Sequence, residues 1–504
     1  MSKYLKAKPY TNKIRPYPKN KPITERQTKG QIYLKMTKET VIIRRCEDYD
    51  PVELEAIITE GMRDLNFTPK GKVMFKANEV AGFYKKRLFR YATTEPAFLN
   101  AALATMQNGW VNAQNVEEIF LGGNSGAKLP TRYALKTSGL WEILKKRKIK
   151  IKPFDEFGEV EVKLNNSRIY DKIKIPTPLY EADTLICLPR LKANLFTGIT
   201  ASIKMNVGML LEHERLKFHD YRLDETIVDL LEIGNYDFIA ADAIIGGEGN
   251  MIDPDPHKIG AIVMGTNPVA VDSILARGVG LSPRDVGHIR VANERGYGPI
   301  KLEEISLKGD MSLGEFKERA EGFKIDDEKL DKLITNNPNS KLKLYVGSCC
   351  SKRPNIYCQG GCMGSLKLAI DIGMRIKPNM LDNLKPMHIV VGHYRGDIKT
   401  NEREPILFIG KDKTYCGNIN NNYVEFNTSE KIRDIRNKSN YKKMYTMKQC
   451  PPSMIDTTMQ LSRLGGVTRV GSPVFNPKNM LGAFPLIRDC LVREIMYQWN
   501  TKMY

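Results

Sequence analysis

Apolar runs that alternate with helical stretches constrain this 504-residue chain more than any other feature. From about residue 40 onward, five such runs are each bounded by Gly, Asn or Pro. They are KVMFKAN (72–78), EEIFLGGNSG (117–126), DTLICLPRLK (183–192), DFIAADAIIGGEG (237–249) and AIVMGTNPVAVD (261–272). Continuous apolar strands separated by helices are typical of a largely parallel sheet that helices cover on both faces. The sequence therefore predicts an α/β fold with a doubly wound, mostly parallel sheet.

Polar residues stand where these predicted strands end. In doubly wound sheets, ligands bind beyond the carboxyl ends of the strands, so these residues are the first candidates for a ligand site. They are Asn78, Asn124, Lys192, Asp242, Asn267 and Asp272.

The densest polar segment covers residues 190–219 and reads RLKANLFTGITASIKMNVGMLLEHERLKFH. It combines Lys192 and Lys204 with small hydroxyl and amide side chains, which offer many hydrogen-bond donors and few acceptors. That mixture suits a carboxylate or phosphate group. The small donors are Thr197, Thr200 and Asn206. The alternative is a solvated basic loop beside histidines that serve only the fold.

We predict that Lys192 and Lys204 bind an anionic substrate and take part in catalysis, with His219 as the proton-transfer group because histidine titrates near neutral pH. The predicted substrate-binding residues are Asn206, Thr197, Thr200, Asp242 and Asp272. The two aspartates could position the lysines or a divalent ion.

The last third of the chain is predicted to be a second, smaller α/β unit. KLKLYVG (341–347), MHIVVGHY (387–394) and EPILFIG (404–410) have the pattern of strands, and residues 365–376 and 454–464 that of helices. The predicted organisation is a basic extended arm over residues 1–38, the main α/β domain over 39–335 and a cysteine-rich α/β domain over 336–504.

Six of the nine cysteines lie in this second unit, between Cys349 and Cys450. Thiolates select zinc, copper(I) or iron-sulfur clusters, and glycine and proline beside several of these cysteines favour a rigid metal site. The predicted ligands of a 4Fe-4S cluster, or alternatively of zinc, are Cys358, Cys362, Cys416 and Cys450. Cys349 and Cys350 are potential substitutes for one ligand. The alternative is a set of buried free thiols.

The chain carries a formal net charge of +20, and its first 38 residues hold eleven Lys or Arg and one acidic residue, Glu25. Such a segment cannot bury enough apolar surface to fold alone, so an extended arm is expected. The arm is either a solvated tail or a clamp on a partner protein or on a second copy in a homodimer. Nucleic acid is a weaker alternative, because no recognised nucleic-acid motif accompanies the basic residues. With no signal peptide, no membrane span and no disulfide framework expected, the predicted compartment is the cytoplasm.

Six ordered blocks carry a resemblance to a known family over roughly residues 40–300. They are ATTEP (92–96), LPRLKANLFTGITASIKMNVG, FH (218–219), ADAIIGGEG, NPVAVD and ERGYGP (294–299). In this order the chain resembles the domain of unknown function 362 family, whose members are commonly described as iron-sulfur proteins and which is distantly similar to the nickel-dependent lactate racemase group.

The resemblance carries over to single positions of this chain. The family's lysine and threonine block corresponds to Lys192, Thr197, Gly198, Thr200, Lys204 and Asn206, its histidine to His219, and its acidic strand ends to Asp242, Glu248 and Asp272. Members often have Lys-Thr-His where this chain has Lys192, Ala193 and Asn194. They also tend to have Gly-Pro where Asn250 and Met251 stand here.

Two classes of function follow as expectations. The first is an iron-sulfur-dependent redox or cofactor-maturation enzyme, an oxidoreductase or lyase, that acts on a small anionic substrate. The second is a non-catalytic metalloprotein with a structural zinc or cluster, which acts as an assembly subunit through its basic arm.

Overall fold

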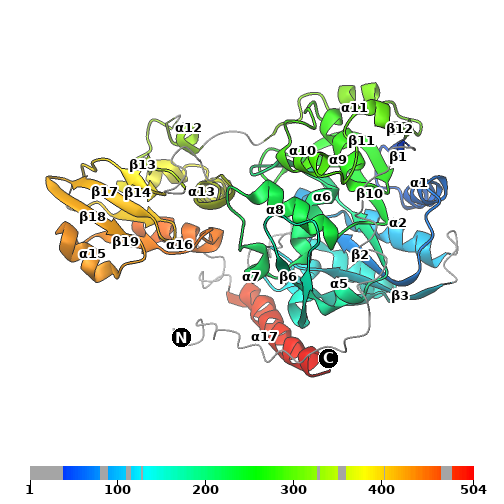
Figure 1. Cartoon of the computed structure of the whole chain (residues 1–504), viewed down its shortest axis with the longest axis horizontal. Coiled ribbons are helices and arrows are strands. Elements are labelled where there is room, and N and C mark those ends of the chain that lie inside the picture. Colours follow the sequence, from blue (N-terminus) through cyan, green and yellow to red (C-terminus); the bar gives the residue numbers. More distant parts are fainter. Residues whose placement is uncertain are drawn as a thin grey trace.

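The computed structural model describes residues 38–79, 89–108, 115–126, 129–251, 253–325, 330–335, 337–349, 359–401, 403–466 and 480–503. The predicted basic arm, except for Lys38, lies outside these residues. Two α/β units lie side by side, with helix α13 (Gly364–Ile376) at the junction between them (Figure 1).

The first unit is built on a ten-stranded sheet. Eight strands follow the order β12 (Ile305–Lys308), β1 (Glu39–Arg45), β11 (Asp255–Gly265), β10 (Phe238–Glu248), β7 (Thr184–Leu188), β2 (Gly71–Ala77), β3 (Val116–Gly123) and β4 (Lys150–Pro153). β8 (Arg190–Asn194) pairs with β10 and with β9 (Gly198–Thr200). The strands from β10 to β4 run parallel, which confirms the predicted mostly parallel α/β sheet.

Helices cover both faces of this sheet. On β2, Val73 and Phe75 pack into one apolar cluster and Met74 into the other, because successive side chains of a strand point to opposite faces. The first cluster includes helices α1 (Pro51–Asp64), α2 (Pro96–Gln107) and α4 (Leu140–Lys146). The second includes α8 (Leu223–Asp229), α9 (Pro268–Gly278) and α10 (Gly287–Glu294). Both faces are thus apolar, which explains the continuous apolar runs in the sequence.

The strands β10 and β11 form an antiparallel hairpin. Because of this reversal, the last residue of β11, Gly265, pairs with Ile239 near the start of β10 and lies at the amino edge of the parallel strands. Asn267 then caps α9 by accepting from the backbone N–H groups of Val269 and Ala270. Asn267 therefore does not belong to the carboxyl edge at which the sequence pattern placed it.

The second unit contains a parallel sheet of four strands in chain order: β13 (Leu342–Val346), β14 (Met387–Val391), β16 (Ile406–Ile409) and β19 (Met444–Met447). One face packs against α13 and α16 (Met454–Leu464). The other packs against β17 (Thr414–Ile419), β18 (Asn422–Asn427) and α15 (Ile432–Ser439), and β17 also pairs with the short strand β15 (Tyr394–Arg395). The sequence predicted a second α/β unit in this part of the chain. Its boundaries, residues 336–504, stay a prediction.

The remaining described elements are shorter and mostly peripheral. They are β5 (Glu159–Lys163), β6 (Lys172–Pro176), α3 (Thr131–Ser138), α5 (Thr177–Glu181), α6 (Ser202–Met205), α7 (Glu212–Arg215), α11 (Leu313–Arg319), α12 (Leu330–Thr335) and α14 (Met380–Asn383).

The C-terminal helix α17 (Met480–Met503) returns to the first unit (Figure 1). Asp489 forms an ion pair with Lys136 at 2.8 Å, and the Asn500 side chain donates to the Glu156 carbonyl at 2.8 Å. None of the helices in the described ranges is long and apolar enough to cross a membrane.

Two kinds of contact join the units at α13. Leu368 belongs to a small apolar cluster with Phe89 and Leu195 of the first unit. Arg375, near the end of α13, forms an ion pair with Asp255 at 2.6 Å. The second unit is therefore docked next to the carboxyl ends of β2 and β8.

Candidate functional site

A cavity of about 290 Å³ lies at the carboxyl ends of β2, β3 and β8, where the first unit meets the second. Its volume is close to the lower end of the range of roughly 300 to 1,000 Å³ that is usual for small-ligand sites. The first unit contributes the strand-end residues Lys76, Asn78, Asn124 and Lys192. The second unit contributes residues from the start of α13 and from the turn that leads into α16.

Two buried lysines face this cavity. The Lys192 ammonium donates to the Ala92 carbonyl at 2.5 Å, and the Lys204 ammonium donates to the Asn194 side-chain oxygen at 2.6 Å. Burial lowers the pKa of each lysine from 10.5 to about 7, and for Lys192 the nearby charge of Lys204 adds to this effect. Both partners are neutral, so neither lysine has a hydrogen-bonded carboxylate at these contacts. The charge of the Asp224 carboxylate opposes the effect of burial on the pKa of Lys204 but does not cancel it, so both charged forms are poorly compensated.

A third lysine in the cavity is paired with a carboxylate. Lys76 and Glu79 form an ion pair at 3.0 Å, and the Lys76 ammonium also donates to the Ala77 carbonyl at 2.5 Å. Burial raises the pKa of Glu79, against the opposing influence of Lys76. The Glu79 Oε1 atom is buried and has no hydrogen-bond partner among the described residues. This oxygen is available to a ligand donor or a water molecule.

The segment after α6 supplies further cavity residues. Arg215 donates to the Ser125 carbonyl at 2.9 Å, and burial lowers the pKa of its guanidinium. The ring of His219 packs edge-on against Phe196, with 5.1 Å between ring centroids. Phe196 also lies 5.6 Å from the Lys204 ammonium, within cation–π range. Phe196 is thus in contact with both His219 and the Lys204 ammonium.

Four of the eight predicted catalytic and substrate-binding residues line the cavity: Lys192, Lys204, His219 and Thr200. The Thr200 hydroxyl is buried and finds no hydrogen-bond partner in the described part of the chain. A buried hydroxyl normally has such a partner, so this one fits a site that binds a polar ligand.

Thr197 and Asn206 do not line the cavity, and both form hydrogen bonds within the protein. The Thr197 hydroxyl is within 3.0 Å of both the Asn194 side-chain oxygen and the Ile199 carbonyl, and it holds the turn between β8 and β9. The Asn206 amide donates to the Leu230 carbonyl at 3.3 Å, and its side chain packs against Gly234.

The two predicted aspartates also lie outside the cavity. Asp272 is buried, and accepts from the backbone N–H groups of Ser202 at 2.8 Å and Ile203 at 3.0 Å and from the Ser202 hydroxyl. It therefore caps the start of α6. Asp242 is fully buried against Arg190, at 3.1 Å.

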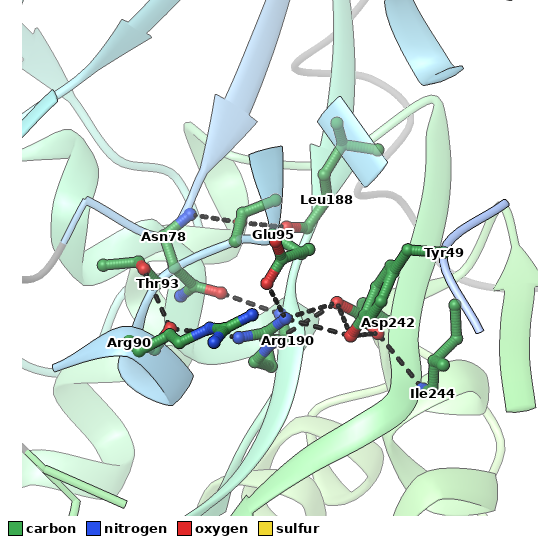
Figure 2. Close-up of polar contacts among 10 residues, drawn as sticks. Tyr49, Asn78, Arg90, Thr93, Glu95, Leu188, Arg190, Asp242 and Ile244 are labelled. Carbon is green, nitrogen blue, oxygen red and sulfur yellow. Dashed lines mark hydrogen bonds and ion pairs between the residues drawn. The ribbon is translucent and has the colours of Figure 1, made fainter. Parts of the chain in front are cut away.

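Arg190 is the centre of a buried polar network (Figure 2). Its guanidinium contacts Asp242, Glu95 at 3.2 Å, the Tyr49 hydroxyl at 3.0 Å and the Arg90 carbonyl at 3.1 Å. Its backbone N–H donates to the Asn78 side chain at 2.7 Å. The network fixes the start of β8, two residues before Lys192.

Sequence reasoning missed Lys76, Glu79 and Arg215 as site residues. A signal for Lys76 was present, since one lysine interrupts the apolar run KVMFKAN immediately before a strand end. Both departures from the family pattern also bear on the cavity. Asn194 accepts from Lys204, and Met251 is a lining residue.

The predicted metal site is spread over different parts of the second unit. Cys358 lies outside the described residues. Cys362 is buried at the start of α13, and Cys450 is exposed in the turn after β19. Cys416 lies within β17, and its sulfur is 3.1 Å from the Tyr423 hydroxyl.

Within the described ranges, no three His, Cys, Asp or Glu side chains come together in a way that could hold a metal ion. Cys362 and Cys450 lie near the carboxyl edge of the four-stranded sheet, as does Cys349 after β13, whereas Cys416 belongs to the neighbouring sheet. The described cysteines therefore do not form a cluster site by themselves. The four-cysteine site, with its 4Fe-4S cluster or zinc, stays a prediction.

Comparisons with known proteins give a family match and a distant structural likeness. Residues 73–277 match the family described as domain of unknown function (DUF362), and no curated protein matches the chain. Among solved structures, the chain is similar to the lactate racemase apoprotein from Thermoanaerobacterium thermosaccharolyticum. The TM-score is 0.31 at 10% sequence identity, over 72% of this chain and 71% of that chain. The matched segment includes all of the described charged residues that line the cavity.

Proposed function

We propose that this chain is an enzyme that binds a small anionic substrate in the cavity and transfers a proton to or from it. The observation that carries the proposal is the pair Lys192 and Lys204, two buried amines in one cavity whose hydrogen-bond acceptors there are neutral. Burying a charge without an opposite charge is costly. An anionic ligand would supply that opposite charge.

The charges of the lining support an anion. Among the described residues, four cationic side chains and two carboxylates line the cavity, which leaves an excess of two positive charges when all six are ionised and His219 is neutral. They are Lys76, Lys192, Lys204, Arg215, Glu79 and Glu212. Since Lys76 is paired with Glu79 at 3.0 Å, the excess resides mainly on Lys192 and Lys204.

Proton transfer is supported by the environment of the same two amines. An amine whose pKa is about 7 is present in both protonation states at neutral pH, so it can act as a general acid or a general base. His219 lines the same cavity and remains a candidate for this role. The two-lysine site thus combines anion binding with acid–base chemistry.

The test is calorimetric titration of the full chain with acetate and inorganic phosphate. We expect Lys192→Met and Lys204→Met each to weaken anion binding by about 1.5 to 3 kcal/mol, the usual value of a hydrogen bond to a charged group. Lys172→Met is the matched control, because Lys172 is exposed and pairs with Glu161 on a peripheral strand. Unchanged affinity in both cavity variants would rule out this site.

Iron-sulfur dependence, and with it a redox or cofactor-maturation role, is a separable part of the proposal. Its support is the concentration of cysteines in the second unit and the position of Pro451, next to Cys450, in the cavity wall. The visible spectrum and the iron and sulfide content of anaerobically purified protein test it. One stoichiometric zinc in colourless protein would instead favour the structural metalloprotein. Cytoplasmic localisation and a partner for residues 1–38 remain predictions.

A further inference from the structure

The lining of the cavity divides by chemistry between the two units. Within the described ranges, every charged lining residue comes from the first unit. The second unit contributes Ser365, Leu368, Pro451, Pro452 and Ser453, none of which is charged. A ligand in this space would therefore meet ammonium groups on the sheet side and mainly apolar groups on the side of α13.

The apolar wall continues into the first unit. Phe196 and Met251 line the cavity and pack, while still partly exposed, against the cluster that contains Leu368. Phe196 lies at the border, since its ring contacts both His219 and the Lys204 ammonium. An apolar surface that continues across both units can bury the body of a ligand whose charge rests on the lysines.

Size and charge narrow the ligand class further. A cavity of about 290 Å³ is at the small end for ligand sites, which favours a compact molecule over a nucleotide. Lys192 lies near Lys204, whose charge adds to burial in lowering the pKa of Lys192. One negative charge is therefore a better match than several.

We propose that the ligand is a monocarboxylate with a compact apolar body, bound with its carboxylate on Lys192 and Lys204 and its apolar group against Phe196, Met251 and the wall formed by Leu368, Pro451 and Pro452. This inference rests on the proposed function and specifies its substrate class. It also assigns the second unit a role in that site, as the part that selects for the apolar group.

The experiment compares acetate, butyrate, phenylacetate and inorganic phosphate by calorimetric titration of the full chain. We expect affinity to rise from acetate to phenylacetate, by about fourfold for each buried methylene. Phosphate should bind more weakly than phenylacetate. If acetate and phenylacetate bind equally well, or if phosphate binds most tightly, the apolar-body inference is wrong and anion binding stands. If none of the four binds, the proposed function itself fails.

Variants of the second unit locate the apolar wall. Leu368→Ser should reduce the affinity ratio of phenylacetate to acetate by at least fivefold. Because Leu368 also joins the units, Pro452→Ser serves as a second variant at a different part of the wall. Val346→Ser, at an apolar position of the second unit that is 37% exposed, is the control. A ratio unchanged in both wall variants would show that α13 and the turn that leads into α16 do not contact the ligand.

Discussion

Arg190 and Lys192 are buried cations two residues apart on the same strand, β8, and their surroundings differ sharply. Arg190 contacts two carboxylates, a hydroxyl and a carbonyl, and the carboxylates raise the pKa of its guanidinium despite burial. Among the described residues, Lys192 donates to one carbonyl oxygen, and burial lowers its pKa to about 7. The charge of Arg190 is thus paired with carboxylates, whereas the hydrogen-bond partner of Lys192 is neutral.

The difference separates structural from functional charges. A buried charge with a complete set of partners stabilises the arrangement of the segments that supply them, here β8, β10 and the residues around Tyr49 and Glu95. A buried charge with an incomplete set reduces stability and gains its partner only when a ligand binds. Sequence alone does not distinguish Arg190 from Lys192, because the partners come from distant parts of the chain.

The largest expected effect comes from breaking the Arg190 network. Asp242→Asn removes a fully buried partner charge, so the free energy of unfolding should fall by about 3 to 5 kcal/mol. Urea denaturation of the full chain measures this loss of stability. Glu161→Gln, which removes an exposed ion pair with Lys172, should change stability by less than about 1 kcal/mol. An equal, small effect of both substitutions would contradict the structural role given to this network.

The pattern of apolar runs was enough to predict the fold class, but not the direction of every strand. Runs such as residues 237–249 and 261–272 are apolar because both faces of the sheet are covered, and this holds for parallel and antiparallel neighbours alike. The β10–β11 hairpin therefore escaped prediction. It moves Asn267 to the opposite edge and leaves the residues that follow it, including Asp272, to packing roles.

For the site, the sequence indicated the lysines, Thr200 and His219 because residues close together in one segment stay close in the fold. It also predicted Asp242 and Asp272, which lie outside the cavity and whose partners are Arg190 and the amino end of α6. It missed Glu79, which becomes a site residue only through Lys76 and the strand-end geometry. Contacts between distant segments decide these cases, and spacing in one sequence does not contain them.

Replacing Lys192 should have the opposite effect on stability. Lys192→Met should raise the free energy of unfolding at pH 7, on the order of 2 kcal/mol, because it removes a buried, poorly compensated charge. In the wild type, the folded-state pKa of about 7 lies below the ordinary 10.5, so the unfolded state binds more protons between these values. The free energy of unfolding of the wild type should therefore rise between pH 7 and pH 10.5. This contribution of Lys192 should be absent in the variant.

Urea denaturation of both proteins at pH 7 and pH 9 measures this difference. Lys204→Met is expected to behave in the same way, since burial lowers the pKa of Lys204 to about 7 as well. If Lys192→Met lowers stability at pH 7 and keeps the wild-type dependence on pH, then Lys192 is satisfied by the protein, as Arg190 is. That result would contradict the inference that Lys192 gains its partner from a ligand.

The smallest expected effect separates two threonines of the same segment. The Thr200 hydroxyl lines the cavity and has no hydrogen-bond partner among the described residues, whereas the Thr197 hydroxyl is hydrogen-bonded within the protein. Thr200→Val should therefore leave stability unchanged or slightly higher and weaken acetate binding by about 1 kcal/mol, the net value of a typical hydrogen bond. Thr197→Val should do the reverse, with a loss of about 1 kcal/mol in stability. Thermal denaturation measures the stability of both variants, and calorimetric titration measures their acetate affinity. If Thr200→Val loses stability and keeps its affinity, the Thr200 hydroxyl has a structural role.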